Sequence, residues 1–351
     1  MPTGSINRQD KRGAQTVSFE CSHEELTRQS SRRARRLSPL AHNAVFSSLG
    51  LSPSYSFALH ETPAFSDPSL LAILRSPTLG GAAVTMPHKV AALSHMDTLG
   101  PEVLEIGSMN TVVVTGFVDE DDGSRRPKLE GRNTDVDGIR GALLSSLPEE
   151  ERTKDKPFGE GRSAIIIGGG GTTRAAVYAL SSMGLSPLWL INRDPVETAA
   201  ILSTPAFARY DLRALEREEQ WGEDEAERVA CGVGAIPSFE PQTEGERNVY
   251  RLAETVFASS GTRSGRGRPL LEMAYKPHVT LMYTLAQKHG WSPIGGIEAL
   301  IHQAFAQDLL WLSESPHTRL GHPAAVERLE DARRAARERV REAAGAPAAG
   351  H

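Results

Sequence analysis

Cysteine is scarce in this sequence, which has only Cys21 and Cys231 among its 351 residues. Two thiols are too few for a disulfide framework or a structural zinc site, and they fit a reducing compartment. Long apolar runs are also lacking, since no segment approaches the roughly 18 consecutive apolar residues of a membrane-spanning helix. The first residues lack the apolar core of a secretory signal. We therefore expect a soluble, cytoplasmic protein without a metal site.

An excess of basic charge is lacking as well. Lysine and arginine total 39, aspartate and glutamate total 44, and the formal net charge is -5. Without an overall positive field, nucleic acid is not an expected partner. The length exceeds what one compact domain usually holds, so the sequence predicts two domains.

Apolar segments of strand and helix length alternate along most of the chain, which predicts an α/β protein. Charged, proline- and glycine-containing stretches separate the expected units. Residues 16–21 are a candidate strand within an otherwise polar N-terminal tail. In order, the expected segments are the tail 1–36, a first domain 37–147, a linker at 148–161, a second domain 160–296, a helix 297–315 that completes the first domain, and a helical, polar tail 324–351.

A glycine-rich turn follows the apolar strand expected at 164–167. Glycines there let the backbone approach a pyrophosphate, and the N-terminus of the next helix stabilises its charge. The third glycine of the G-x-G-x-x-G pattern is replaced by Thr173, so an ordinary strand-to-helix turn is the alternative. The turn nevertheless predicts a Rossmann-type dinucleotide site that contains Gly168, Gly170, Gly171 and Thr172.

The next expected strand ends in Asn192, Arg193 and Asp194. A guanidinium can bind the 2′-phosphate of NADP through two hydrogen bonds, whereas NAD enzymes usually offer a carboxylate to the ribose hydroxyl. Asn192 and Arg193 therefore favour NADP as the cofactor. Asp194 opposes this choice by repulsion, so NAD remains an alternative.

Lys89 lies shortly after a buried strand expected at 82–84. Pro87 is suited to the first turn of a helix, which would place Lys89 near a helix N-terminus. A cation is disfavoured there, and this placement suits a lysine that transfers protons. Position alone favours the alternative that Lys89 is an exposed surface lysine.

Seven segments resemble motifs of the shikimate/quinate dehydrogenase family, in the family's order. Gly81–Lys89 resembles G-x-x-V-T-x-P-x-K, and Asn133–Gly138 resembles N-T-D-x-x-G. The resemblance covers about residues 37–312, and the other five segments are Ser38–Asn43, Ile106–Thr111, Gly168–Arg174, Glu272–Pro277 and Gly296–Gln303. Of these, Glu272–Pro277 and Gly296–Gln303 are most similar to the shikimate dehydrogenase domain of fungal pentafunctional aromatic-pathway enzymes.

The resemblance implies a substrate-binding domain at 37–147 and a Rossmann-type domain at 160–296. It implies that Lys89 and Asp135 are the catalytic pair, and that the substrate is a small polyol carboxylate, shikimate or quinate. The reaction would be reversible hydride transfer between NAD(P) and 3-dehydroshikimate or 3-dehydroquinate. The residues implied to contact the substrate are Ser38, Thr85, Asn110, Tyr275 and Gln303.

The sequence departs from the family pattern in the substrate domain. The apolar strand that opens the family's domain is replaced by the arginine-rich residues 32–36. Arg36 stands where the family has a serine, and Ala83 replaces a polar residue beside the substrate. Fungal quinate repressors resemble this family without catalysing a reaction, so a ligand-sensing regulator is the alternative function.

Overall fold

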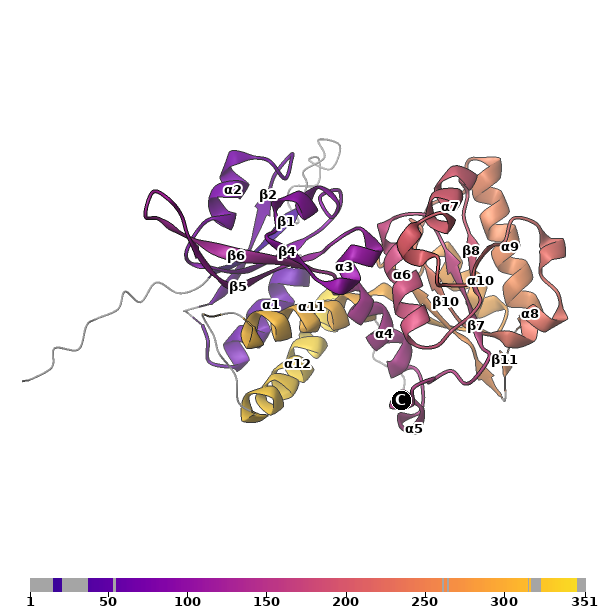
Figure 1. The fold of residues 1–351 in the computed structure, drawn as a ribbon. Coiled ribbons are helices and arrows are strands. Elements are labelled where there is room, and N and C mark those ends of the chain that lie inside the picture. The colour runs from indigo at the N-terminus through magenta and orange to yellow at the C-terminus, as the bar shows by residue number, and fades with distance from the viewer. Residues whose placement is uncertain are drawn as a thin grey trace, which may run out of the picture.

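The computed structural model describes residues 15–20, 37–52, 55–260, 262–263, 265–314, 316 and 323–345. Two six-stranded sheets form two lobes of an α/β protein (Figure 1). None of the described helices is long and apolar enough to cross a membrane.

The first sheet is mixed, with the strand order β2-β1-β3-β5-β6-β4. β1 pairs in parallel with β2 and β3, whereas β3, β5 and β6 are antiparallel neighbours. Its strands are β1 (Gln15–Glu20), β2 (Ser56–Glu61), β3 (Leu79–Val84), β4 (Thr98–Leu99), β5 (Thr111–Asp119) and β6 (Arg125–Arg132). The helices of this half are α1 (Leu37–Ser48), α2 (Pro68–Leu74), η2 (Ala91–His95), α3 (Pro101–Ile106), α4 (Asp135–Ser145) and α5 (Glu149–Arg152).

The second sheet is parallel throughout, with the order β14-β13-β10-β7-β8-β9. This is the Rossmann order, in which β7 and β10 flank the point where the chain changes direction. Its strands are β7 (Ser163–Ile167), β8 (Leu188–Ile191), β9 (Leu212–Ala214), β10 (Val229–Gly234), β13 (Pro269–Glu272) and β14 (Ser292–Gly295). Its helices are α6 (Gly171–Ser182), α7 (Pro195–Leu202), η3 (Pro205–Phe207), η4 (Glu218–Gln220), α8 (Glu223–Arg228), α9 (Glu244–Ser260) and α10 (Leu281–Lys288).

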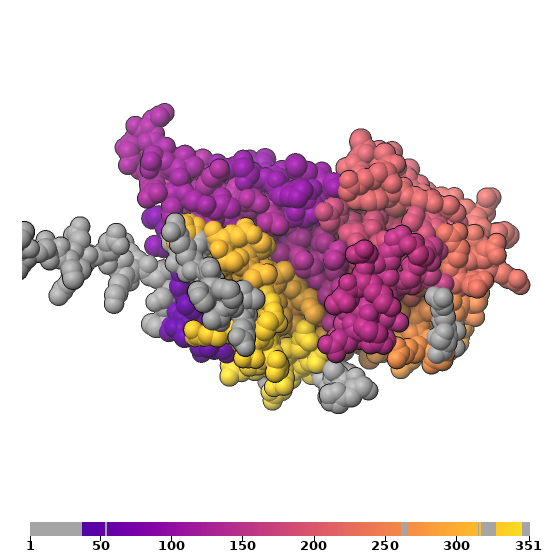
Figure 2. Space-filling model, turned by 60° about the horizontal axis from the view of Figure 1, so that its bottom comes forward, coloured from indigo at the N-terminus to yellow at the C-terminus, as the bar shows by residue number. Residues whose placement is uncertain are grey.

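Two helices near the C-terminus return to the first lobe. α11 (Gly296–Ser313) packs against α4, and α12 (Pro323–Ala344) packs against α1. Leu329, Ala336 and Val340 of α12 are buried in the same apolar cluster as residues of α1 and α11. Figure 2 shows α12, in yellow, on the surface beside α1, in indigo. The segment expected to be a helical, polar tail is therefore helical but contributes to the core.

Close packing of α4 on α11 depends on two glycines. A Cβ atom at Gly138 would lie 2.7 Å from the backbone oxygen of Ala299, and one at Gly141 would overlap the His302 ring. Real Cβ atoms do not approach other atoms so closely, so any larger residue would push the helices apart. The N-terminus of α4 and the middle of α11 are thus held together at the junction of the two lobes (Figure 1).

Two local expectations were wrong. The candidate strand at 16–21 is confirmed, because residues 15–20 form β1 between β2 and β3, and the expectation that the arginine-rich residues 32–36 replace the first strand is wrong. Pro87 does not open an α-helix, because residues 86–90 form turns that lead into the short 3-10 helix η2. Between α9 and β13, β11 (Thr262–Arg263) and β12 (Arg266–Gly267) form a small antiparallel pair.

The position of β1 predicts a strong effect of N-terminal truncation. Deleting residues 1–20 would leave β2 and β3 without the strand that pairs with both. We expect the unfolding midpoint in a thermal scan to fall by at least roughly 10 °C, or the cooperative transition to be lost. Deleting residues 1–10, which retains β1, is the control. Equal midpoints for both truncations would contradict the placement of β1.

Candidate active site

A pocket of about 180 Å³ lies at the junction of the two lobes. All seven residues expected to be catalytic or to contact the substrate line it, although they come from six separate segments. They are Ser38 of α1, Thr85 and Lys89 after β3, Asn110 before β5, Asp135 at the start of α4, Tyr275 after β13 and Gln303 of α11. Ala83 also lines the pocket, whereas Arg36 lies outside the described residues.

Lys89 and Asp135 form an ion pair in this pocket. Lys89 Nζ lies 2.5 Å from Asp135 Oδ2, and the two side chains are only 18% and 13% exposed. Asp135 is the first residue of α4, where the helix dipole stabilises a negative charge. Lys89 lies in the turn just before the short 3-10 helix η2, and the Asp135 carboxylate is its charged partner.

Asn110 fixes the other oxygen of the carboxylate. Its Nδ2 donates to Asp135 Oδ1 at 2.9 Å, and its Oδ1 accepts from the backbone N–H of Thr134 at 2.7 Å. Gln303 is within reach of the same amide, since Asn110 Nδ2 lies 3.4 Å from Gln303 Oε1. Gln307, which the motif analysis did not single out, donates to Thr111 Oγ1 at 3.0 Å and also lines the pocket.

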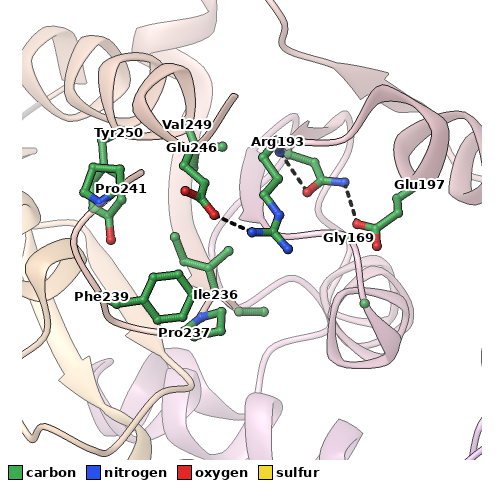
Figure 3. Close-up of a pocket in the computed structure, with 13 residues that line it drawn as sticks. Gly169, Arg193, Glu197, Ile236, Pro237, Phe239, Pro241, Glu246, Val249 and Tyr250 are labelled. Carbon is green, nitrogen blue, oxygen red and sulfur yellow. Dashed lines mark hydrogen bonds and ion pairs between the residues drawn. The ribbon is translucent and has the colours of Figure 1, made fainter. Parts of the chain in front are cut away.

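A second pocket, of about 210 Å³, lies at the carboxyl ends of β7, β8 and β10 (Figure 3). Of the six residues expected to bind the dinucleotide, Gly170, Asn192 and Arg193 line it. Gly168, Gly171 and Thr172 do not, but they form the turn and the first residues of α6 beside it.

The backbone of the glycine-rich turn suits an anion. Gly168 has φ 137°, which side-chain-bearing residues rarely adopt, and a Cβ there would lie 2.9 Å from the backbone oxygen of Ala235. Gly170 precedes α6 and provides no side chain that caps its first N–H groups. Those groups are therefore open to a phosphate, and the turn fits the pyrophosphate of a dinucleotide.

Sequence reasoning missed the acidic residues of this pocket. Glu197 of α7 accepts a hydrogen bond from Asn192 Nδ2 at 3.2 Å, and Glu246 of α9 forms an ion pair with Arg193 (Figure 3). Glu197 follows the strand end closely and could have been considered. Glu246 lies more than fifty residues after Arg193, and no local pattern connects the two. The described residues contain no cluster of His, Cys, Asp and Glu placed to hold a metal ion.

A buried carboxyl group, that of Glu272, lies at the end of β13. It accepts from the backbone N–H of Ala274 at 3.2 Å and from Thr280 Oγ1 at 3.1 Å. Burial raises the pKa of Glu272 to about 7. The folded state therefore binds this proton more tightly than the unfolded chain does. Protonated Glu272 thus contributes to the free energy of unfolding at low pH, and this contribution is lost as the pH rises from about 4.5 to 7.

Replacing Glu272 with glutamine should remove this cost of ionisation. The free energy of unfolding of Glu272→Gln, relative to that of the unmodified chain, should rise by on the order of 3 kcal/mol from pH 5 to pH 8. Urea unfolding at both pH values measures the difference, with the exposed Glu240→Gln as the matched control. A difference that does not change with pH would mean that Glu272 ionises in the folded protein as it does in water.

Asn110 is predicted to matter for folding as well as for the site. In Asn110→Ala the buried N–H of Thr134 loses its acceptor, which should lower the free energy of unfolding by about 1–3 kcal/mol. Chemical unfolding measures this loss, and Asn248→Ala, in a residue of α9 that does not line the pocket, is the control. Unchanged stability would show that another group satisfies Thr134.

Comparison with known proteins agrees with this geometry. Residues 34–112 match the family model described as the shikimate dehydrogenase substrate binding domain. The chain is 25% identical to the dehydroquinate dehydratase and shikimate dehydrogenase structure from S. pombe AroM, with a TM-score of 0.65. That match covers 91% of this chain and 53% of the S. pombe chain, so this chain spans about half of that protein.

Two further structures are similar over nearly their whole length. Shikimate 5-dehydrogenase from Thermus thermophilus, in complex with NADP(H) and shikimate, is 25% identical, with a TM-score of 0.59 and 92% and 99% of the two chains covered. Quinate dehydrogenase from Corynebacterium glutamicum, in complex with NAD, is 19% identical, with a TM-score of 0.63 and coverage of 92% and 98%, and this likeness shows the fold. Together, these findings show that residues 34–112 match the shikimate dehydrogenase substrate binding domain and that the chain is similar in structure to shikimate and quinate dehydrogenases.

Proposed function

We propose that the protein is an NAD(P)-dependent dehydrogenase that interconverts 3-dehydroshikimate and shikimate, or 3-dehydroquinate and quinate. The observation that carries this proposal is the Lys89–Asp135 ion pair, which faces a pocket beside a Rossmann-type sheet. The Thermus thermophilus relative was crystallised with NADP(H) and shikimate, which supports this substrate class.

The dinucleotide supplies or accepts the hydride when it is bound. As a ketone is reduced, its oxygen gains negative charge and needs a proton. Lys89 would donate that proton from Nζ, and in the reverse direction it would remove the hydroxyl proton. Asp135 would keep the ammonium group in place, because its own orientation is fixed by Asn110.

The remaining pocket residues suit a polyol carboxylate. Ser38 and Thr85 offer hydroxyl groups, Tyr275 a phenol and Gln303 an amide. These neutral groups can donate hydrogen bonds to a carboxylate or to ring hydroxyls, and their fixed positions would select the substrate by shape and bonding pattern. The glycine-rich turn and the uncapped start of α6 fit the cofactor's pyrophosphate.

Turnover by the purified full chain tests the proposal. Absorbance of the reduced nicotinamide should change with shikimate or quinate when NAD or NADP is present. Lys89→Ala should lower kcat by about 100-fold or more, because no other amine lines the pocket among the described residues. Lys128→Ala, an exposed lysine of β6, is the matched control and should retain full turnover.

Two results would contradict the proposal. Near-normal turnover by Lys89→Ala would remove this lysine from the proton transfer. Tight binding of shikimate or quinate by the unmodified chain, with no turnover with either cofactor, would instead favour the ligand-sensing regulator.

A further inference from the structure

The charged side chains that line the dinucleotide pocket are two carboxylates and one guanidinium. They belong to Glu197, Glu246 and Arg193. The rest of the described lining is uncharged and includes Ile236, Pro237 and the half-exposed Phe239. An adenine ring suits such an apolar surface, but both NAD and NADP contain this ring, so its binding does not distinguish them. The charged groups are the ones that respond most strongly to the change from a neutral 2′-hydroxyl to a charged 2′-phosphate.

Arg193 is already paired with Glu246. One oxygen of the Glu246 carboxylate binds the guanidinium. The other accepts hydrogen bonds from the backbone N–H groups of Gln242, at 2.8 Å, and Thr243, at 3.0 Å. These backbone donors lower the pKa of Glu246 to about 2, so the carboxylate is ionised at neutral pH. The carboxylate is fixed by the loop before α9, and it neutralises the cation that a phosphate would need.

Glu197 adds a second carboxylate on the other side of Arg193 (Figure 3). Asn192 links the two residues, because its Oδ1 accepts from the backbone N–H of Arg193 and its Nδ2 donates to Glu197 Oε2. A Cβ atom at Gly169 would overlap this carboxylate oxygen, so Glu197 lies directly against the glycine-rich turn. Asp194 does not line the pocket. Its side chain caps α7 by accepting a hydrogen bond from the backbone N–H of Val196.

We infer that this pocket selects a dinucleotide whose adenosine ribose has a free 2′-hydroxyl, NAD over NADP, and that Glu197 and Glu246 determine this choice. A ribose hydroxyl can donate a hydrogen bond to a carboxylate. A 2′-phosphate carries a charge of about -1.5 to -2, and two carboxylates would repel it. It would have to share Arg193 with Glu246, which already neutralises the guanidinium and which backbone donors hold in place.

This inference rests on the proposed function and reverses the preference for NADP that Arg193 indicates when the sequence is read alone. The difference arises because a guanidinium attracts a phosphate only when no carboxylate already neutralises it. Glu246 provides that carboxylate from α9, a helix distant in the sequence from the tip of β8.

Direct binding of reduced cofactors tests the inference without requiring turnover. Fluorescence titration of the purified full chain, without substrate, gives a Kd for NADH and for NADPH. We expect the Kd of NADH to be at least about tenfold lower, a difference of about 1.4 kcal/mol. Addition of sodium chloride should not invert this order, because the preference does not depend on a free surface cation.

Two variants isolate the carboxylates. Glu246→Gln frees the guanidinium and should lower the Kd of NADPH by about fivefold or more, with the Kd of NADH changed less than about twofold. Glu197→Gln should lower the Kd of NADPH and raise that of NADH, because the ribose hydroxyl loses a charged acceptor. Glu240→Gln removes the same charge from an exposed residue that does not line the pocket, and should change neither.

The possible failures are distinguishable. If NADPH binds as tightly as NADH and neither variant changes the ratio, the inference is wrong while the proposed dehydrogenase function stands. If neither dinucleotide binds, both the proposed function and the inference are overturned.

Discussion

The ion pair between Lys89 and Asp135 joins two segments that the chain brings to one point from different parts of the first lobe. Lys89 comes from the turn after β3, and Asp135 begins α4 after the antiparallel strands β5 and β6. Asn110, which immediately precedes β5, bonds to the carboxylate and to the backbone at Thr134. Pairing of β3 with β5 sets the distance between these segments, so the geometry of the sheet determines the geometry of the site.

The second constraint is the contact between α4 and α11. Gly138 allows the helices to approach closely, and this brings Gln303 of α11 beside Asn110 and the start of α4. Apolar residues of α4, including Ile139 and Leu143, are buried in one cluster with residues of α6 and β7 from the second lobe. The pocket that Lys89 and Asp135 line therefore lies where the packing of the first lobe continues into the second sheet, and the glycine-rich turn leads from β7 into α6.

Sequence patterns predicted features whose causes are local. The apolar strand before Gly168, the left-handed Gly184 after α6 and the helix at the C-terminus follow from periodicity and from glycine's conformational freedom. Interactions between distant segments could not be predicted in this way. β1 has few apolar residues and is separated from α1 by sixteen residues, so its place within the sheet depends on pairing with β2 and β3. The role of Arg193 likewise depends on Glu246, which only the folded chain places beside it.

In the proposed mechanism the reacting oxygen of the substrate binds at the Lys89–Asp135 pair. A crystal structure of the protein with shikimate and an oxidised dinucleotide would locate that oxygen. We expect a ring hydroxyl within about 3.2 Å of Lys89 Nζ and next to the nicotinamide, with the substrate carboxylate toward Ser38 and Tyr275. A substrate bound with its carboxylate on Lys89, or with no hydroxyl near the ion pair, would contradict this mechanism.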